Sequence, residues 1–223
     1  MQTVTFSQKG SKSDTNEDAC LSLPSRGLLV VADGVGGGPS GDFASRAVVN
    51  TLYDIFRDRE VSQEAVVDSI QRANDFIYQS AQSMDRKGMA STVVVGWRSG
   101  SRVSCFNVGD SRIYHVRDGK IKQLTRDHTR QVQKAPNVIK QMVTNAVGIK
   151  PALQVEVSHH ECSPGDLLLL MTDGISDLLD QDSIVGIVSS PQYSLAEKAR
   201  ALVAESERRG GQDDKSVILA LMA

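Results

Sequence analysis

Short apolar runs and helical periodicities follow one another along the chain, and they predict a mixed α and β protein. The segment 28–32 is a continuous apolar run that ends in Asp-Gly, which is typical of a buried strand. Two segments, 43–56 and 63–84, carry apolar residues at helical spacing. A later helix is expected from 194 to about 210, because its first residues, Ser-Leu-Ala-Glu, form a capping box and two glycines follow its end.

The middle and the end of the chain are rich in β-prone residues. The Asp118-Gly119 pair lies between two apolar runs and predicts a tight hairpin. The segment 129–146, which holds Pro136 and few strong patterns, is expected to be a surface loop or a short helix. Short turns join most neighbouring strands, which favours antiparallel sheets with segregated helices. The expected strands are 92–97, 103–108, 113–116, 121–124, 155–157, 167–171 and 217–221.

Size and charge narrow the class of protein. The chain has 223 residues, with 40% apolar and 23% charged residues, which suits a single globular domain over 1–223. The formal net charge is −2, so nucleic acid is not an expected partner. No apolar stretch approaches about 20 residues, so no membrane span is expected.

The first residues lack the features of a secretory signal, and we expect a cytoplasmic protein. No apolar stripe is obvious, and we expect a monomer.

The three cysteines, Cys20, Cys105 and Cys162, are widely separated. An odd number without close pairs argues against both a disulfide framework and a thiolate metal site. Their neighbours are apolar or β-prone, so we expect all three to be inert packing residues.

Carboxylates recur at the ends of the apolar strands. Asp33 ends the first buried run, Asp110 and Asp173 follow later ones, Asp213 precedes the last, and Asp18 lies in an Asn-Glu-Asp triplet near the start. A single aspartate of this kind is ordinary turn chemistry. Five of them brought together would repel one another unless cations neutralised them. Oxygen ligands without paired His or Cys favour Mg²⁺ or Mn²⁺ over Zn²⁺.

Eight short motifs span nearly the whole chain. They are NED at 16–18, DGVGG at 33–37, GDFAS at 41–45, STVVV at 91–95, VGDSRIY at 108–114, LTRDHT at 124–129, TDGISD at 172–177 and GGQDDKSV at 210–217. This ordered set resembles the 2C-type metal-dependent Ser/Thr protein phosphatases, and most of all their bacterial branch, which acts beside Hanks-type kinases. No single motif is decisive, but their order is specific.

The resemblance implies an α+β fold, an αββα sandwich of two antiparallel sheets flanked by helices, with the metals at one end. It implies two or three Mn²⁺ or Mg²⁺ ions per chain. Asp110, with Asp173, would bind a third and weaker metal, and Glu17 would act through bound water. The ligands of the binuclear centre would be Asp18, Asp33, Asp173, Asp213 and the backbone carbonyl of Gly34.

The expected reaction is hydrolysis of phosphoserine and phosphothreonine in proteins. Two cations about 3.5–4 Å apart can bridge a water and lower its pKa towards about 7. The hydroxide then attacks phosphorus in line with the leaving oxygen, so no Ser or Cys nucleophile is assigned. The expected partners are phosphorylated proteins and a Ser/Thr kinase of the same pathway.

The sequence departs from the family pattern at the phosphate-binding position. An arginine usually stands three residues after the glycine of the first motif, and here that position is Ser13. The adjacent Lys12 supplies charge without the bidentate guanidinium fork, so Lys12 and Ser13 are the candidate phosphate-binding residues.

Other departures concern the proton donor and the substrate flap. Gly38 and Val35 occupy positions where relatives carry histidines, so the leaving-group proton is expected from metal-bound water. His128 is expected to anchor a loop. The stretch around 129–146 would be a shortened flap, and Asp214 stands where the family usually has asparagine.

Two other functions remain open at this point. The Ser13 departure is compatible with a phosphoprotein-binding regulatory module that has an impaired centre; Mn²⁺-dependent hydrolysis of an aryl phosphate separates this from an enzyme. The glycines at 36–41 also satisfy G-x-G-x-x-G, with Asp54 and Asp58 downstream, as in dinucleotide-binding oxidoreductases. Stabilisation by NAD would favour that reading.

Overall fold

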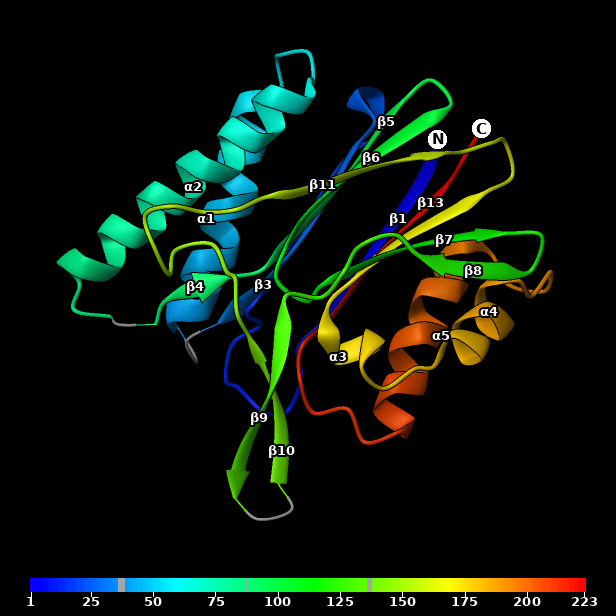
Figure 1. Ribbon diagram of the computed structural model, residues 1–223. Helices are drawn as coiled ribbons and strands as arrows, with labels where there is room; N and C mark the ends of the chain where they lie inside the picture. The colour runs from blue at the N-terminus through cyan, green and yellow to red at the C-terminus, as the bar shows by residue number, and fades with distance from the viewer. Residues whose placement is uncertain (36–38, 87, 136–137) are drawn as a thin grey trace.

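Two antiparallel sheets pack face to face, and helices cover their outer faces (Figure 1). The computed structural model describes residues 1–35, 39–86, 88–135 and 138–223. This is the α+β sandwich that the motifs imply.

The first sheet joins the two ends of the chain. Its strand order is β1 (Gln2–Gln8), β13 (Lys215–Leu221), β12 (Leu167–Met171), β7 (Arg112–Arg117) and β8 (Lys120–Gln123). The first and last strands therefore lie side by side, in antiparallel register. The predicted β7–β8 hairpin is present, and Asp118 and Gly119 have φ of 50° and 70° at its turn. Positive φ at both positions is typical of a type I′ turn, whose twist matches that of the strands.

The second sheet has six strands. Its order is β11 (Glu156–Glu161), β6 (Arg102–Val108), β5 (Val93–Ser99), β3 (Leu28–Val35) and β2 (Asp18–Leu23), and β4 (Ala90–Ser91) pairs with β3. A 3-10 turn, η1 (Pro24–Arg26), joins β2 to β3.

Helices cover each sheet on the side away from the other sheet. α1 (Pro39–Phe56) and α2 (Gln63–Ser83) pack on the second sheet, and α3 (Asp173–Ser176), α4 (Gln181–Val188) and α5 (Leu195–Arg208) pack on the first. The predicted capping box of α5 is present. Leu28 and Val30 of β3 face α1 and α2, whereas Leu29 and Val31 face the other sheet. Burial on both faces explains why this strand reads as an unbroken apolar run.

A two-stranded hairpin projects from the sandwich (Figure 1). It consists of β9 (Thr129–Ala135) and β10 (Val138–Val143), and we call it the arm. The prediction of a loop or short helix over 129–146 is therefore wrong. Arg130, Gln131 and Gln133 are exposed, so packing imposes no apolar alternation on this described part of the arm.

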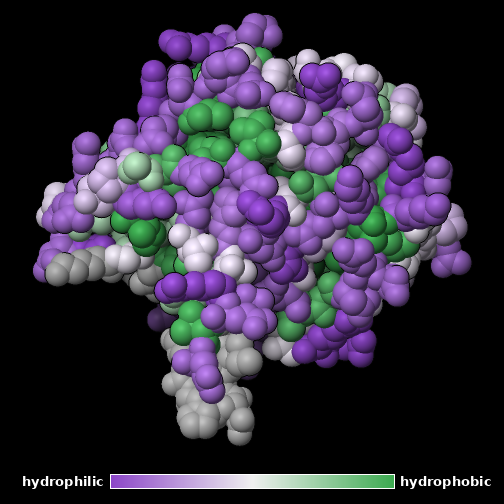
Figure 2. Space-filling model, in the orientation of Figure 1, coloured by the Kyte–Doolittle hydropathy of each residue, from purple (hydrophilic) through white to green (hydrophobic). Residues whose placement is uncertain are grey.

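The surface agrees with the expectation from composition. The face in Figure 2 is mainly hydrophilic, with apolar residues in small separate patches. No helix within the described residues is long and apolar enough to cross a membrane. The three cysteines are free thiols, and burial raises the pKa of Cys20 and Cys105 to about 12. Such thiols stay protonated and unreactive, as predicted.

Candidate metal centre

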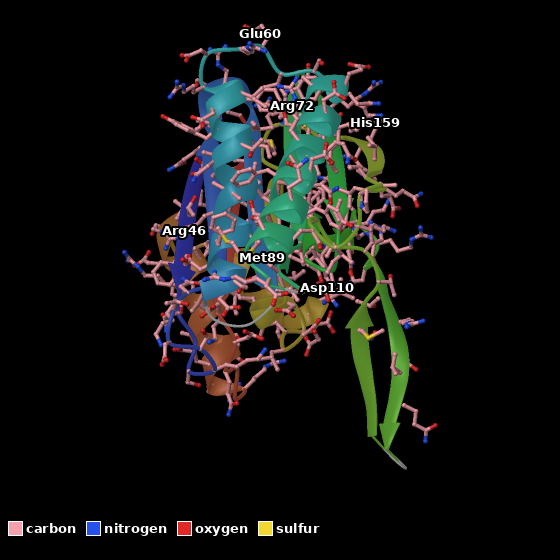
Figure 3. All side chains as sticks on the ribbon, turned by 90° about the vertical axis from the view of Figure 1, so that its left-hand side faces the viewer. Arg46, Glu60, Arg72, Met89, Asp110 and His159 are labelled. Atoms are coloured by element: carbon pink, nitrogen blue, oxygen red, sulfur yellow. The ribbon has the colours of Figure 1, made fainter. Side chains whose placement is uncertain are left out.

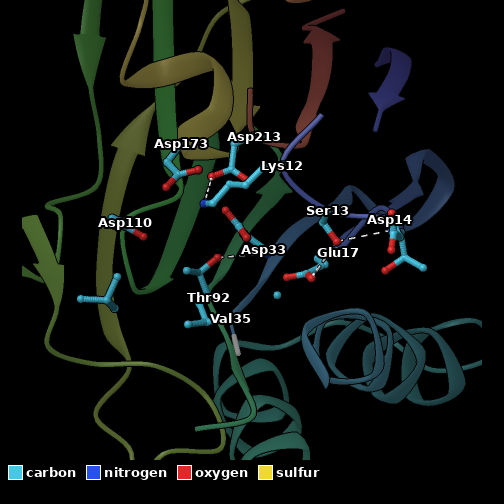
Figure 4. Close-up of a pocket in the computed structure, with 13 residues that line it drawn as sticks. Lys12, Ser13, Asp14, Glu17, Asp33, Val35, Thr92, Asp110, Asp173 and Asp213 are labelled. Carbon is cyan, nitrogen blue, oxygen red and sulfur yellow. Dashed lines mark hydrogen bonds and ion pairs between the residues drawn. The ribbon is translucent and has the colours of Figure 1, made fainter. Parts of the chain in front are cut away.

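Segments far apart in the sequence bring five aspartates to one end of the sandwich. Asp18 opens β2 and lies opposite Asp33 of β3 in the ladder. Asp173 begins α3 directly after β12, and Asp213 lies two residues before β13. Together with Asp110, three of them (Asp33, Asp173 and Asp213) line a cavity of about 640 Å³ (Figure 4). The structure thus brings together the carboxylates that the sequence singled out.

Asp18 is buried behind this cavity. Its Oδ2 accepts a hydrogen bond from the Thr172 hydroxyl at 3.0 Å, and that hydroxyl accepts one from the Ser216 amide at 3.0 Å. Its Oδ1 is also buried and has no hydrogen-bond partner among the described residues. Burial raises the pKa of Asp18 to about 7, and the nearby charges of Asp214 and Asp173 act in the same direction. Thr172 thus orients Asp18, a role the sequence did not suggest.

Asp33 and Asp173 belong to the same group of buried, mutually repelling carboxylates as Asp18. Burial raises the pKa of Asp33 well above its ordinary value, and the charges of Asp18 and Asp173 raise it further. Burial also raises the pKa of Asp173, together with the charge of Asp213. Oδ1 of Asp173 is a second buried oxygen without a hydrogen-bond partner in the described part of the chain. A cluster of this kind must hold either protons or cations.

Asp110 reaches the same cavity from the turn after β6. The turn is tight, since Gly109 has φ of 107° and packs against Thr92. The Thr92 hydroxyl accepts a hydrogen bond from the Asp33 amide at 3.1 Å and shares another with Ser111 at 2.8 Å. Thr92 lies in the STVVV motif, to which the sequence assigned no role. Burial raises the pKa of Asp110 to about 7, with the charge of Asp173 adding to the effect.

Gly34 has no room for a side chain. Its amide donates to the Glu17 carbonyl at 3.0 Å, and a Cβ at this position would collide with the carbonyl oxygen of Gly41. Glu17 packs against Gly41, and its Oε1 accepts a hydrogen bond from the Ser13 hydroxyl at 3.2 Å. Gly34 and Glu17 both line the cavity, so a glycine here keeps the backbone close to the carboxylates.

Asp213 is paired with Lys12. The Lys12 ammonium lies 2.6 Å from Oδ2 of Asp213, and both side chains are partly exposed. The charges of Asp173 and Asp33 also face this ammonium, and the hydrogen bond to Asp213 raises the pKa of Lys12. Lys12 therefore lies among the carboxylates, where it supplies positive charge.

Asp214 holds the loop that carries Lys12. Its Oδ1 accepts the Gly10 amide and its Oδ2 accepts the Glu17 amide, both at 2.7 Å. The amides of Ser11 and Lys12 bond to the carbonyl of Gln212 at 2.8 and 3.0 Å. The aspartate in place of the usual asparagine thus fixes the β1–β2 loop with two carboxylate oxygens.

The donor set fits a hard divalent cation. It consists of carboxylate and carbonyl oxygens. Two of the buried carboxylate oxygens, on Asp18 and Asp173, accept no hydrogen bond from any residue that the structure describes. As the side chains stand, no three His, Cys, Asp or Glu residues within the described ranges are arranged around one cation position. The Lys12–Asp213 pair supplies a physical reason, because a cation that takes Asp213 as a ligand must first displace the ammonium.

The histidines lie outside this cavity. His128 anchors a loop as predicted, because its Nδ1 accepts the Gly109 amide at 3.2 Å and its Nε2 lies 2.9 Å from Oε2 of Glu156. His115 pairs with Asp166 at 2.8 Å. Val35 lines the cavity, whereas the glycines at 36–38 lie outside the described residues.

Known proteins are similar to this chain in sequence and in fold. The family model described as Protein phosphatase 2C matches residues 8–208. The Serine/threonine phosphatase stp of Listeria welshimeri serovar 6b is 30% identical over 210 residues, covering 86% of this chain and 83% of that protein. The chain belongs to the protein phosphatase 2C family. The fold and the protein phosphatase class predicted from the motifs are therefore confirmed, and the oxidoreductase reading is rejected.

Two solved structures illustrate the likeness. PppA, described as a key regulatory component of T6SS in Pseudomonas aeruginosa, is 31% identical, with a TM-score of 0.87 over 99% of this chain and 97% of that chain. The catalytic domain of the serine threonine protein phosphatase PstP, in complex with 2 manganese ions, is 26% identical, with a TM-score of 0.84 over 100% of this chain and 98% of that chain.

Proposed function

We propose that this chain hydrolyses phosphoserine and phosphothreonine in proteins with two or three Mn²⁺ or Mg²⁺ ions. The residues that would hold the binuclear pair are Asp18, Asp33, Asp173, Asp213 and the carbonyl of Gly34. Asp110, with Asp173, would hold a third ion. The observation that supports the proposal most is the convergence of these carboxylates at one cavity. Burial and mutual repulsion raise the pKa values of Asp18, Asp33, Asp110 and Asp173. When bound, such cations supply a water of lowered pKa and neutralise charge on the phosphoryl oxygens.

The chain's own residues then prepare the site in three ways. Thr172 and Thr92 fix the carboxylate of Asp18 and the backbone of Asp33 through their hydroxyls. Burial removes water from the carboxylates and strengthens their attraction for cations. Asp214 holds the β1–β2 loop so that Lys12 stays at the cavity.

Lys12 would contact the substrate phosphate once a cation has taken Asp213. It lines the cavity, as does Ser13, and its ammonium can approach an anion as a point charge. Replacing Lys12 by Ala should raise the KM for a phosphothreonine peptide and leave kcat less affected, because phosphate binding is lost. An unchanged KM would contradict this role.

The deciding experiment is a phosphatase assay on an aryl phosphate and on phosphothreonine peptides. Turnover should require Mn²⁺ or Mg²⁺ and stop when a chelator is added. Asp33→Asn should remove it, whereas Asp58→Asn, an exposed position on the α1–α2 connection, should not. Folded protein that binds a phosphopeptide without hydrolysing it would instead favour the regulatory module, which the Lys12–Asp213 pair and Ser13 still allow.

We further propose a monomeric catalytic domain over 1–223 that acts in the cytoplasm and opposes a Hanks-type kinase. The arm, in the place of the family's flap, would be its shortened counterpart. Sedimentation, and dephosphorylation of the products of such a kinase, would test these points separately.

A further inference from the structure

The root of the arm separates two cavities. Val143 of β10 lines the carboxylate cavity of the candidate metal centre. The next residue, Thr144, lines a second cavity of about 380 Å³, which we call the root cavity, together with Arg126, His128 and Lys150. Thr144 follows the last residue of β10, and its amide still bonds to the His128 carbonyl across the ribbon at 2.7 Å. Successive residues of such extended backbone point to opposite faces, so we place the two cavities on opposite sides of the ribbon. Figure 3 shows Asp110 of the metal centre close to this root.

Among the arm residues whose side chains the structure describes, the strand register assigns Arg130 to the root-cavity side. Arg130 lies opposite Met142, and the Thr144 amide bonds to the His128 carbonyl at 2.7 Å, so the ladder continues beyond the last pair. Residues directly opposite share a face, as do alternate residues of one strand. His128, Arg130, Met142 and Thr144 therefore share the face that continues into the root cavity.

This face is cationic in a chain whose net charge is negative. Arg130 and Lys150 are exposed, and the Arg126 side chain is 81% exposed. Among the described residues that line the root cavity, Glu156 is the single acidic one. Three cations against one anion leave a local excess of two positive charges. The sequence between Asp127 and Glu156 has the same sign of charge, because its Lys and Arg residues number four, Arg130 and Lys150 among them, and it holds no acidic residue.

Glu156 indicates the kind of ligand that this face accepts. Its Oε2 lies 2.9 Å from His128 Nε2 and 3.5 Å from Arg126 Nη2, so a carboxylate already occupies part of the root cavity. Arg130 and Lys150 have no such intramolecular carboxylate among the ion pairs of the described residues. A long polyanion such as nucleic acid would extend to the other side of the arm and be repelled by the carboxylates of the candidate metal centre. A short acidic segment would stay on the cationic side.

We propose that the root cavity and the adjoining face of the arm dock an acidic segment of the phosphoprotein substrate. This rests on the proposed function and adds a substrate class to it: phosphoproteins with a run of Asp or Glu at a distance from the phosphorylated residue. The segment that links the phosphorylated residue to the acidic run would have to pass round the arm. The phosphorylated residue itself would enter the other cavity.

The size of the effect follows from the exposure of the cations. A single exposed ion pair changes affinity by about five-fold or less, so three together would give roughly 10- to 100-fold at low salt. Most of this would disappear towards 1 M salt, where the Debye length falls to about 3 Å.

Binding can be measured without catalysis. The probe is a fluorescent peptide of alternating Glu and Gly without phosphate, titrated with the full chain in a chelator and followed by anisotropy. Arg126→Gln/Arg130→Gln/Lys150→Gln should weaken binding at least 10-fold, and Arg130→Gln or Lys150→Gln alone about two- to five-fold. Lys120→Glu, an exposed charge change at the start of β8 and away from the arm, should leave Kd unchanged (Figure 1).

Kinetics then separate docking from chemistry. A phosphothreonine peptide with a distant acidic run should have a KM at least five-fold below that of its Gln-substituted counterpart, and the triple variant should lose this difference. Aryl phosphate turnover should stay within two-fold in the same variant. Peptide binding that survives the triple variant, or single-stranded DNA that binds as tightly as the acidic peptide, would overturn the docking proposal. Absence of aryl phosphate turnover in the unmodified chain would instead count against the proposed function.

Discussion

Replacing Lys12 by methionine should make the candidate centre bind Mn²⁺ more tightly. In the structure the Lys12 ammonium lies 2.6 Å from Oδ2 of Asp213, so a cation can use that oxygen only after the ammonium has moved. Methionine keeps an unbranched side chain of similar reach and removes the charge. The variant therefore isolates the competition between a tethered cation and a free one.

Two electrostatic contributions set the magnitude. The side chains of Lys12 and Asp213 are 66% and 41% exposed, and solvent reduces the worth of such a pair to about 0.2–1 kcal/mol. The variant also loses the repulsion between the ammonium and a divalent ion, which is about 1 kcal/mol at roughly 8 Å in water. Their sum, about 1–2 kcal/mol, corresponds to Mn²⁺ binding that is roughly 5- to 30-fold tighter.

Calorimetric titration of Mn²⁺ into chelator-stripped protein measures this directly. Lys9→Met is the matched control, because Lys9 is an exposed lysine of the same loop whose ammonium bonds to the Ser13 carbonyl at 2.9 Å. It removes the same charge near the centre without touching Asp213. Lys12→Met protein that binds Mn²⁺ no more tightly than the Lys9→Met protein would refute the competition.

Three further predictions concern the carboxylates. Asp33→Asn and Asp173→Asn should each lower turnover by more than roughly 10- to 100-fold, which is the loss typical of mutating a residue that only hydrogen-bonds to a metal ligand. Without metal, both variants should be at least as stable as the parent protein in calorimetric melting, because the substitution removes repulsion between carboxylates. Without metal, the free energy of unfolding should fall by up to about 4 kcal/mol as pH rises from 4 to 7. The reason is that the pKa of Asp18 is about 7 in the folded chain, which therefore holds a proton that the unfolded chain releases near pH 3.8. Urea titrations in a chelator would measure this fall, and added Mn²⁺ should reverse it. Asp214→Ala should lower the free energy of unfolding by roughly 2–4 kcal/mol, because the amides of Gly10 and Glu17 then lose their acceptor. Asp214→Asn should lower it less, and equal urea midpoints for the two variants would contradict this role.

The buried strands could be predicted because packing dictates their composition. The run 28–32 has helices on one side and a sheet on the other, so it is apolar throughout. None of the arm side chains that the structure describes is fully buried, so packing does not impose an apolar alternation on them. β1, β2 and α4 were also missed, since their burial is partial and their patterns are correspondingly weak.

Some residues of the candidate site could likewise be predicted from the sequence, whereas others could not. Aspartates at strand ends can be recognised because the strands themselves are recognisable, and the motif order supplied their grouping. The Lys12–Asp213 pair joins residues 201 positions apart, and Asp214 reaches Gly10 across 204 positions. Contacts of that kind depend on loop conformation, which no local pattern encodes. Thr172 and Thr92 escaped notice because threonine is ordinary strand composition.

The pairing of β1 with β13 has a consequence for synthesis on the ribosome. Strand β1 emerges early but stays without its neighbour until the last strand has been translated, roughly 10–40 s later at 5–20 residues per second. Asp213 arrives with that last segment. A nascent chain that has not yet reached Asp213 would therefore lack part of the candidate metal centre, and products truncated before this residue should be inert.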